Sequence, residues 1–462
     1  MALRPVSLIH RRRSLVAGLV LVTIAALSLS RTLTYASFSA RAGEPTIFTA
    51  SPLVCVDKTY ESARASNGAP TASFRDNLKV DRKYITSWTS AGWTNDVATY
   101  INLIYLGLIT ERIPIVPDFL PSHIGVHVPP IPFGDVFDLP RLRNQLGTAV
   151  LEWRDVKDVN STFVDDLGCW NVWEAVQFRH AHPRDSWHPT HLGLDISYTK
   201  VPGWVKLIPD SEHDYHATFW ALATLAFPSG QKANMVPPSP SPEHHSLLAP
   251  DEQLLCYDFL YYVVAHRVLF LTEEQSGSDR QHGSPAWRSV GTHMHWNPSL
   301  EELAESYLRA AMRLSEESPL VPFISVHVRH ADFESWCNGI PVKQCFASLA
   351  AINRQVQQIR AEMLRLKGVR IHHVVMTSDE RDAIWWHDVA ELGWLRIDHS
   401  RTAHVYGEWY PVLIDAVIQS KGAAFVGTDR SSMSVLAGRR VEDWQNGLSA
   451  LVKWGTATSD DH

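Results

Sequence analysis

The sequence is poor in several features that mark common classes of protein. Its 462 residues include only five cysteines, whose spacing matches neither a zinc ribbon nor a CxxC redox site. Basic residues are not in excess, because 42 Lys and Arg stand against 49 Asp and Glu, for a formal net charge of −7. A protein that binds a nucleic-acid backbone concentrates positive charge. We therefore expect no nucleic-acid partner.

Charge is absent altogether from residues 14–30, SLVAGLVLVTIAALSLS, and arginines precede this run at positions 4 and 11–13. Its 17 residues reach the lower end of the roughly 17–25 that span a membrane, and preceding arginines keep the amino end in the cytoplasm. We expect a cytoplasmic tail at 1–13, a signal-anchor helix at 14–30 and a stem at 31–72. A cleaved signal peptide ending near residue 40, which would give a secreted protein, is the alternative.

Either arrangement places the rest of the chain in an oxidising compartment. Cys337 and Cys345 enclose a short loop, and a disulfide between them would pin it. The other three cysteines leave at least one thiol unpaired or paired outside the chain. Asn160 begins an Asn-Ser-Thr triplet and is a candidate for glycosylation in the lumen.

The length exceeds a single core, so we expect two domains, at 73–317 and 318–462. The first should begin with a strand at 84–88, a tight loop at 89–93, a helix capped by Thr94 or Asn95 and a strand at 112–116. This is a βαβ unit whose first loop can turn backbone N–H groups toward a ligand.

The middle of the chain gives weaker signals. Segments 121–140 and 227–250 are rich in proline, which favours surface excursions over core. Residues 258–273 read as an apolar helix, and the capping box at Ser299 opens another helix to about residue 317. Histidines 180, 182, 188, 191, 293 and 295 lie here with Asp185 and Asp195. Because they lack HExxH spacing, we favour structural roles over a metal site.

The second domain alternates strands and helices, which predicts a mostly parallel sheet. Strands are expected at 323–329, 369–376, 392–397 and 423–426, with a long helix at 346–367. In the first strand, Ile324, Val326 and Val328 share one face, while Ser325, His327 and Arg329 share the other.

Polar side chains follow three of these strands at their carboxyl ends, where open α/β sheets bind ligands. His327 and Arg329 end the first strand, Asp379 follows the second, and Ser431 and Ser432 follow the last. Arginine offers a fork of donors that suits phosphate, a carboxylate can accept the paired donors of a guanine edge, and a helix start suits a phosphate. Together these residues predict a nucleotide-diphosphate pocket.

The motifs HVRHADF at 327–333, TSD at 377–379 and FVGTDRSSM at 425–433 resemble those of the GDP-fucose protein O-fucosyltransferase-like family, which is related to α1,6-fucosyltransferases. The early loop AGWTND at 91–96 is similar to that family's first loop. The resemblance covers roughly residues 83–438 and is specific only in the second domain. It implies a GT-B fold, with two Rossmann-type domains facing a cleft, an acceptor-side first domain and a GDP-sugar-binding second domain.

The resemblance also implies roles for single residues. Arg329 would hold the β-phosphate, His327 and Asp379 would contact guanosine or phosphate, and the donor site would be completed by Ser431, Ser432, Asn95 and Gly92. It implies a membrane-anchored lumenal enzyme of the Golgi or endoplasmic reticulum that moves fucose from GDP-fucose to a protein or glycan hydroxyl, with inversion and without a cofactor.

Two features bear on the chemistry. The chain contains no Asp-x-Asp sequence, the usual signature of metal-held sugar nucleotides, so Arg329 and the helix end at Ser431 would carry the electrostatic stabilisation. One branch of the family has a Glu base in its early loop, whereas the nearest carboxylate here is Asp96. The base is therefore not identified. A lumenal GDP-sugar-binding protein without transferase activity and, less favoured, a histidine-based metallohydrolase remain as alternatives.

Overall fold

The computed structural model describes residues 65–125, 127–177, 180–265 and 284–456. The described residues belong to one compact unit. The predicted tail, the anchor and most of the stem lie outside the described residues, as does Cys55. Within the described ranges, no helix combines the length and the apolar character that crossing a membrane would need.

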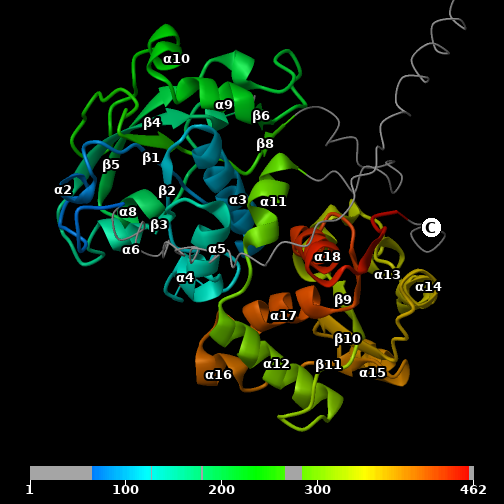
Figure 1. The fold of residues 1–462 in the computed structure, drawn as a ribbon. Coiled ribbons are helices and arrows are strands. Elements are labelled where there is room, and N and C mark those ends of the chain that lie inside the picture. Colours follow the sequence, from blue (N-terminus) through cyan, green and yellow to red (C-terminus); the bar gives the residue numbers. More distant parts are fainter. Residues whose placement is uncertain (1–64, 126, 178–179, 266–283, 457–462) are drawn as a thin grey trace, which may run out of the picture. The chain divides into compact units, whose positions relative to one another are not determined.

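Two parallel sheets organise the chain (Figure 1). The first has the order β3-β2-β1-β7-β4-β5 and the second the order β11-β10-β9-β12-β13. All strand pairs within them are parallel. The strands of the first sheet are β1 (Tyr84–Ser87), β2 (Ile113–Val116), β3 (Leu151–Glu152), β4 (Asp165–Asn171), β5 (Leu194–Lys200) and β7 (Leu254–Tyr257). Those of the second are β9 (Phe323–Val328), β10 (His373–Ser378), β11 (Leu395–Arg396), β12 (Ala424–Thr428) and β13 (Leu448–Val452).

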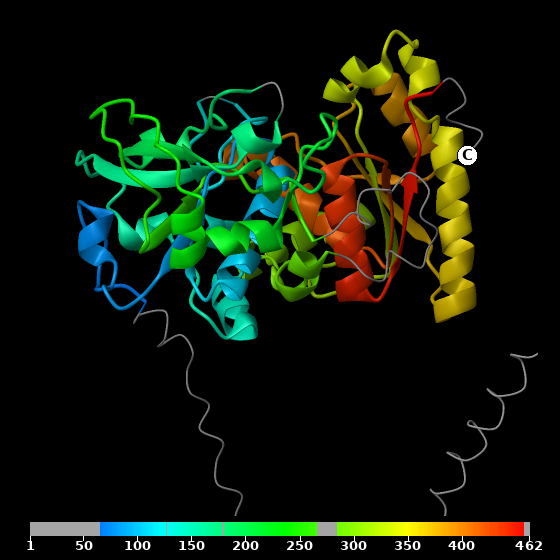
Figure 2. The same ribbon diagram turned by 90° about the horizontal axis from the view of Figure 1, so that it is seen from above.

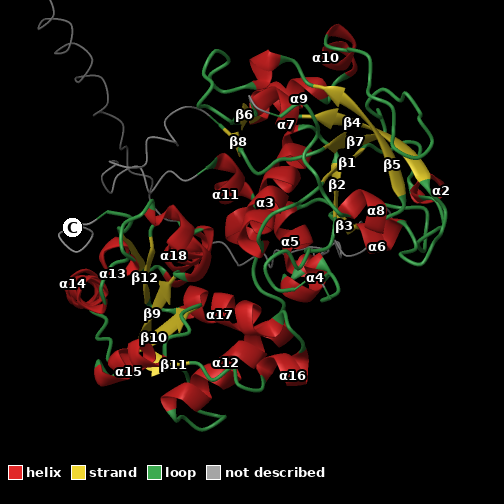
Figure 3. Cartoon of the chain, turned by 180° about the vertical axis from the view of Figure 1, so that it is seen from behind, coloured by secondary structure: helices red, strands yellow, loops and turns green. Residues whose placement is uncertain are grey.

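Helices and short elements connect these strands (Figure 3). In the first part they are α2 (Phe74–Asn77), α3 (Trp93–Ile109), α4 (Phe133–Val136), α5 (Leu139–Leu146), α6 (Trp153–Val156), α7 (Trp173–Val176), α8 (His188–His191), η1 (Gly203–Val205), α9 (Phe219–Leu225), α10 (Pro228–Ala233), α11 (Pro285–Ser289), η4 (Gly291–His293) and α12 (Pro298–Met312), with a small sheet of β6 (Ala217–Thr218) and β8 (Val263–Val264). In the second part they are η5 (Ala331–Cys337), α13 (Val342–Cys345), α14 (Leu349–Lys367), α15 (Ala383–Glu391), α16 (Thr402–Tyr406), α17 (Tyr410–Lys421) and α18 (Ser432–Gln445).

The second sheet is covered on both faces, as parallel sheets require. One face of β9, with Ile324, Val326 and Val328, packs in a cluster with α14 and α15. The other face carries Ser325 and His327 toward α17 and α18, and Figure 2 shows α14 and α18 on opposite sides of the sheet. The alternation predicted for this strand therefore separates a purely apolar face from a polar one.

Several expected elements are present with shifted bounds. The βαβ unit exists, but its helix begins at Trp93 with Gly92 as N-cap, ahead of the expected caps. The helix expected at 346–367 is α14, which begins three residues later and ends at Lys367, with Gly368 as a left-handed C-cap. Helix α12 is capped by Asn297, whose side chain accepts from the Ser299 amide, so the predicted capping box is wrong.

Two predictions for the middle of the chain are wrong. Residues 258–265 form turns and the strand β8 instead of the start of an apolar helix, while 266–273 lie outside the described residues. Segment 121–140 is not a surface excursion, because Phe133, Val136 and Phe137 are fully buried in the main core. Its prolines interrupt regular structure, yet its aromatic side chains pack on Tyr100 and Trp296.

Both bridges in the described residues lie at carboxyl-edge positions. One joins Cys169 in β4 to Cys256 in β7, so these two thiols are not free. The other joins Cys337 to Cys345, the pairing that the sequence favours. The backbone N–H of Gly455 donates to the Cys345 carbonyl at 2.7 Å, which ties the second loop to the chain end.

Candidate functional site

The candidate site lies at the carboxyl ends of β9 and β12, two neighbouring strands of the second sheet. From β9 the chain proceeds to β10 and β11 on one side, and then returns to β12 and β13 on the other. Ligands of open α/β sheets bind where the strand order reverses in this way. The predicted ligand-binding residues are therefore brought to the position where the topology favours a ligand.

Arg329 is the centre of this edge. Its backbone N–H donates to the Thr428 hydroxyl at 2.9 Å, which fixes the end of β9 against the end of β12. Its side chain is 28 % exposed, and its guanidinium contacts two carboxylates, Asp379 at 2.7 Å through one terminal nitrogen and Asp332 at 2.6 Å through the other. The donor fork is thus held in a defined place and is neutralised by groups of the protein.

Asp379 has a different environment from the one expected of a guanine-reading residue. One oxygen accepts the backbone N–H of His330 at 2.8 Å and the other pairs with Arg329. The neighbouring Glu380 accepts from the His330 ring at 2.7 Å. The structure therefore brings Asp379 to Arg329, and its contacts are those of a residue that positions the guanidinium.

His327 is buried behind Arg329. Its Nδ1 is 2.8 Å from the Ser434 hydroxyl, which itself accepts the backbone N–H of Thr428 at 3.0 Å. The hydroxyl keeps its own proton for one further bond, and we assign that proton to Nδ1, which places the imidazole proton on Nε2. Burial, and then the positive charge of Arg329, lower the pKa of His327 to about 3, so the ring is a neutral donor at this edge.

The amino terminus of α18 completes the edge. Ser431 is the N-cap, and its buried hydroxyl accepts the Ser434 N–H at 3.4 Å. Arg430 just before it adopts the left-handed conformation with φ of +62°, which turns the chain from β12 into the helix. Ser432 begins the helix, and the unpaired N–H groups and the positive end of the dipole there favour an anion.

A contact joins this edge to the first sheet. The hydroxyl of Ser432 lies 2.7 Å from that of Thr94, in the first turn of α3. The predicted donor-site residues Gly92 and Asn95 flank Thr94, so they lie near the start of α18. Asn95 Oδ1 is buried and has no hydrogen-bond partner among the described residues.

Asp96 lies in the same turn but faces inward. It is 1 % exposed, and neither carboxylate oxygen meets hydrogen-bond geometry with a described residue. Burial raises its pKa well above the usual value, and the approach of Thr89 and of the Ala91 amide offsets this only in part. A buried carboxyl of this kind does not reach an acceptor, so the geometry does not favour Asp96 as the base.

An aromatic cluster stands beside Arg329. The His330 ring stacks on Phe346 at 4.4 Å, and Phe333 stacks on both Trp336 and Trp454. A small pocket opens next to this cluster, lined among others by His327, Arg329, His330, Phe346, Thr428 and Trp454. Flat faces at the mouth of a phosphate-binding edge can stack a nucleotide base.

The histidines of the middle segment do not converge on one point. His188 is buried, with Nε2 2.8 Å from the Asp118 carbonyl, and burial lowers its pKa to about 4. His180 packs against Trp173 and His182, and His191 stacks on Trp187. These contacts agree with structural roles.

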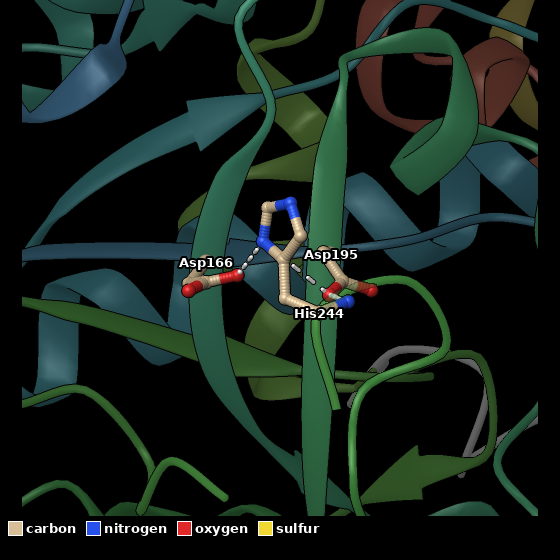
Figure 4. Close-up of side chains that lie close together, drawn as sticks. All are labelled: Asp166, Asp195 and His244. Atoms are coloured by element: carbon tan, nitrogen blue, oxygen red, sulfur yellow. Dashed lines mark hydrogen bonds and ion pairs between the residues drawn. The ribbon is translucent and has the colours of Figure 1, made fainter. Parts of the chain in front are cut away.

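A different group, Asp166, Asp195 and His244, is the one metal-competent cluster among the described residues (Figure 4). His244 Nδ1 is 2.7 Å from Asp166, whose hydrogen bond raises the pKa of the imidazole. Asp195 accepts from the Ser241 hydroxyl and from the amides of Glu243 and His244. Because its ligand atoms already serve each other and the turn at 241–246, the cluster is explained as a loop anchor.

The sequence pointed to fewer residues than the edge contains. Thr428 and Ser434, which link β9, β12 and α18, lie in or next to the FVGTDRSSM motif, and a hydroxyl at a strand end could have identified them. Thr94 could not be assigned, because its partner is 338 residues away. Trp454 follows β13, a strand whose short sequence gave no signal.

Comparison of the sequence with models of protein families and with curated proteins finds no match. Among solved structures, the fold is similar to POFUT1 in complex with GDP-fucose, with 14 % identity, a TM-score of 0.49, and coverage of 82 % of this chain and 99 % of that one. It is also similar to NodZ α1,6-fucosyltransferase soaked with GDP-fucose, with 14 % identity, a TM-score of 0.36, and coverage of 78 % and 93 %. The fucosyltransferase NodZ from Bradyrhizobium gives 12 % identity, a TM-score of 0.37 and the same coverage. With TM-scores below 0.5, the residues of the site must carry any statement about function.

Proposed function

We propose that this chain is a glycosyltransferase of the fucosyl type. It binds GDP-fucose at the carboxyl edge of the second sheet and transfers fucose to a hydroxyl of a protein or glycan acceptor. The transfer inverts the anomeric centre and needs no metal. A lumenal location, with the chain anchored through residues 14–30, is part of the proposal.

The observation that carries it is the position of Arg329 beside the start of α18. A guanidinium fork and a helix amino terminus at neighbouring strand ends together provide the donors that a diphosphate needs. Neutral His327 adds a further N–H donor without a charge that would have to be desolvated. His330, Phe346 and Trp454 line the small pocket beside Arg329 and offer a place for the base of the nucleotide.

The same groups suit the chemical step. The acceptor oxygen forms a bond to the anomeric carbon as the bond from that carbon to the β-phosphate oxygen breaks. The electron pair leaves with GDP, where charge develops on the diphosphate. Fixed cationic and N–H donors stabilise such charge most when they are already oriented, as Arg329 is by Asp379 and Thr428.

Calorimetric titration of the purified chain with GDP and with GDP-fucose, each with and without EDTA, tests the proposal. Arg329→Ala should weaken binding by about 2–4 kcal/mol, roughly 30- to 1,000-fold in Kd, because a charged phosphate contact is lost. Arg365→Ala, an exposed arginine in the last turn of α14, is the matched control and should bind normally.

Three results would count against parts of the proposal. A folded wild type that binds neither ligand contradicts the donor site. Binding that disappears with EDTA contradicts metal independence. Binding of GDP-fucose with no turnover on any acceptor, water included, would favour a GDP-sugar-binding protein.

A further inference from the structure

The first turn of α3 is covered by a side chain from a distant segment. A Cβ built on Gly92 would lie 2.8 Å from Cδ2 and 3.1 Å from Nε2 of His123. The edge of the imidazole therefore packs directly on the N-cap of α3. Only glycine at position 92 leaves the ring this space, since any larger residue would push it away.

This contact places His123 near the proposed donor site. Gly92 is two residues before Thr94, whose hydroxyl is 2.7 Å from Ser432 at the start of α18. His123 thus contacts Gly92, and Thr94, two residues later, contacts the helix end that would hold the diphosphate. The residue is exposed, and no described residue forms a hydrogen bond or an ion pair with its ring.

The segment that carries His123 is fixed on both sides. Phe119 and Ile131 exchange backbone hydrogen bonds of 2.8 and 3.1 Å at its base. Beyond His123, the carbonyl of Pro129 accepts the indole N–H of Trp409 at 2.8 Å, beside the start of α17. The segment is accordingly held by its own backbone bridge and by the start of α17.

The carboxylates of this region are less suitable as bases. Asp96 is buried and Asp379 stays paired with Arg329, while Asp332, which a diphosphate would displace from Arg329, would face the leaving group and not the acceptor. An acceptor hydroxyl that attacks a sugar needs a group that is accessible and free to take its proton. His123 meets both conditions.

We propose that His123 is the general base of the transfer, an inference that rests on the proposed function. An imidazole nitrogen takes the proton of the acceptor hydroxyl as its oxygen bonds to the anomeric carbon of fucose. The bond from that carbon to the β-phosphate oxygen breaks, and its electron pair leaves with GDP. No co-reactant is required, and the proton on the imidazole passes to solvent.

Release of GDP from GDP-fucose, with water as the acceptor, measures the step without knowledge of the natural acceptor. His123→Ala should lower kcat by about 100-fold or more, as removal of a general base does, while the Kd for GDP stays within twofold. His127→Ala removes an exposed histidine of the same segment and should behave as wild type.

Gly92→Ala provides a second test. Its backbone, with φ of −70°, suits alanine, so its effect should act through displacement of the His123 ring. We expect a lower kcat when His123 is present and no further loss in the His123→Ala background. Equal effects in both backgrounds would mean that Gly92 acts by another route and would overturn the inference.

The outcomes separate this inference from the proposed function. A wild type that does not bind GDP refutes the donor site itself. If His123→Ala binds GDP and keeps a kcat within twofold of wild type, only the role of His123 is refuted. If His123→Ala loses GDP binding and rate together, His123 has a structural role, and the inference is again refuted. If the wild type releases no GDP, the NMR signals of the histidine rings, recorded with and without GDP, test the inference instead. GDP must shift the ring signals of His123 and not those of His127. Unshifted His123 signals overturn the inference.

Discussion

The carboxyl edges of the two sheets treat their buried polar groups in opposite ways. At the second edge, buried His327, Thr428 and Ser434 have hydrogen-bond partners, and Asp379 Oδ2, which has none, is ion-paired with Arg329. At the first edge, seven of the fourteen buried side-chain N and O atoms that lack a hydrogen-bond partner among the described residues belong to Ser87, Trp88, Thr89, Trp93, Asn95 and Asp96. An unsatisfied buried group costs about 1–3 kcal/mol, so this concentration is not neutral.

The difference shows how the two parts would share one reaction. A preorganised edge suits a ligand of fixed chemistry, because the protein pays no reorganisation when the ligand binds. The unpartnered groups at the first edge are buried, so ordered water, and not an acceptor, can supply their missing partners. In the proposed transfer the second edge would therefore bind the donor, and the first edge, against which the exposed His123 packs, would meet the acceptor.

The largest expected effect is the loss of unfolding free energy when either disulfide is removed. One disulfide lies near each edge. Cys169 and Cys256 are 87 residues apart, whereas Cys337 and Cys345 are 8 apart. Loop entropy predicts a loss of about 4–5 kcal/mol in unfolding free energy for the first pair replaced by serine and about 2–3 kcal/mol for the second. Only the second should also weaken GDP binding, because its two cysteines directly adjoin Trp336 and Phe346 of the aromatic cluster beside Arg329.

Denaturant unfolding and calorimetry on the two double variants measure both quantities. A GDP affinity unchanged in the Cys337→Ser, Cys345→Ser variant would separate the aromatic cluster from the binding site. An equal loss of GDP affinity in both variants would show that the edges are not independent.

The contrast also explains what the sequence can predict. Alternation in 323–329 and the motif at 425–433 are local signals, so Arg329, His327 and the start of α18 could be placed together without a structure. The contact of His123 with Gly92 spans 31 residues, and the burial of Phe133 and Phe137 depends on packing against helices formed far away in the chain. Such features follow from tertiary contacts, which no periodicity contains.

Titration should affect the two edges with opposite signs. His327 has its pKa lowered to about 3, so its contribution to stability is full above pH 6.5 and is lost as the pH falls toward 3. Asp96 has its pKa raised by burial, so its contribution is full below the usual value of 3.8 and is lost as the pH rises through the native pKa. We expect effects of about 1 kcal/mol for each unit of pH within these windows.

His327→Gln should therefore flatten the loss of unfolding free energy between pH 6.5 and 4, and Asp96→Asn should flatten the loss on the alkaline side. Denaturant unfolding at several pH values measures both. Parallel curves of unfolding free energy against pH for wild type and Asp96→Asn would mean that the Asp96 carboxyl is paired and charged. The two edges would then not differ at Asp96.

The smallest expected effect is the change in GDP affinity when the Asp332 carboxylate beside Arg329 is neutralised. Asp332 is 53 % exposed and lies 2.6 Å from Arg329, in the place where a phosphate oxygen would approach the guanidinium. A diphosphate must displace this carboxylate, whereas Asp379 can stay and orient the fork from the other side. Because exposed ion pairs contribute about 0.2–1 kcal/mol, Asp332→Asn should tighten GDP binding by roughly two- to fivefold.

Glu334→Gln removes an exposed charge of the same segment and controls for the general increase in positive potential. Calorimetry that shows weaker binding in Asp332→Asn would mean that both carboxylates hold Arg329 in its binding position, and equal gains in the two variants would assign the effect to long-range charge.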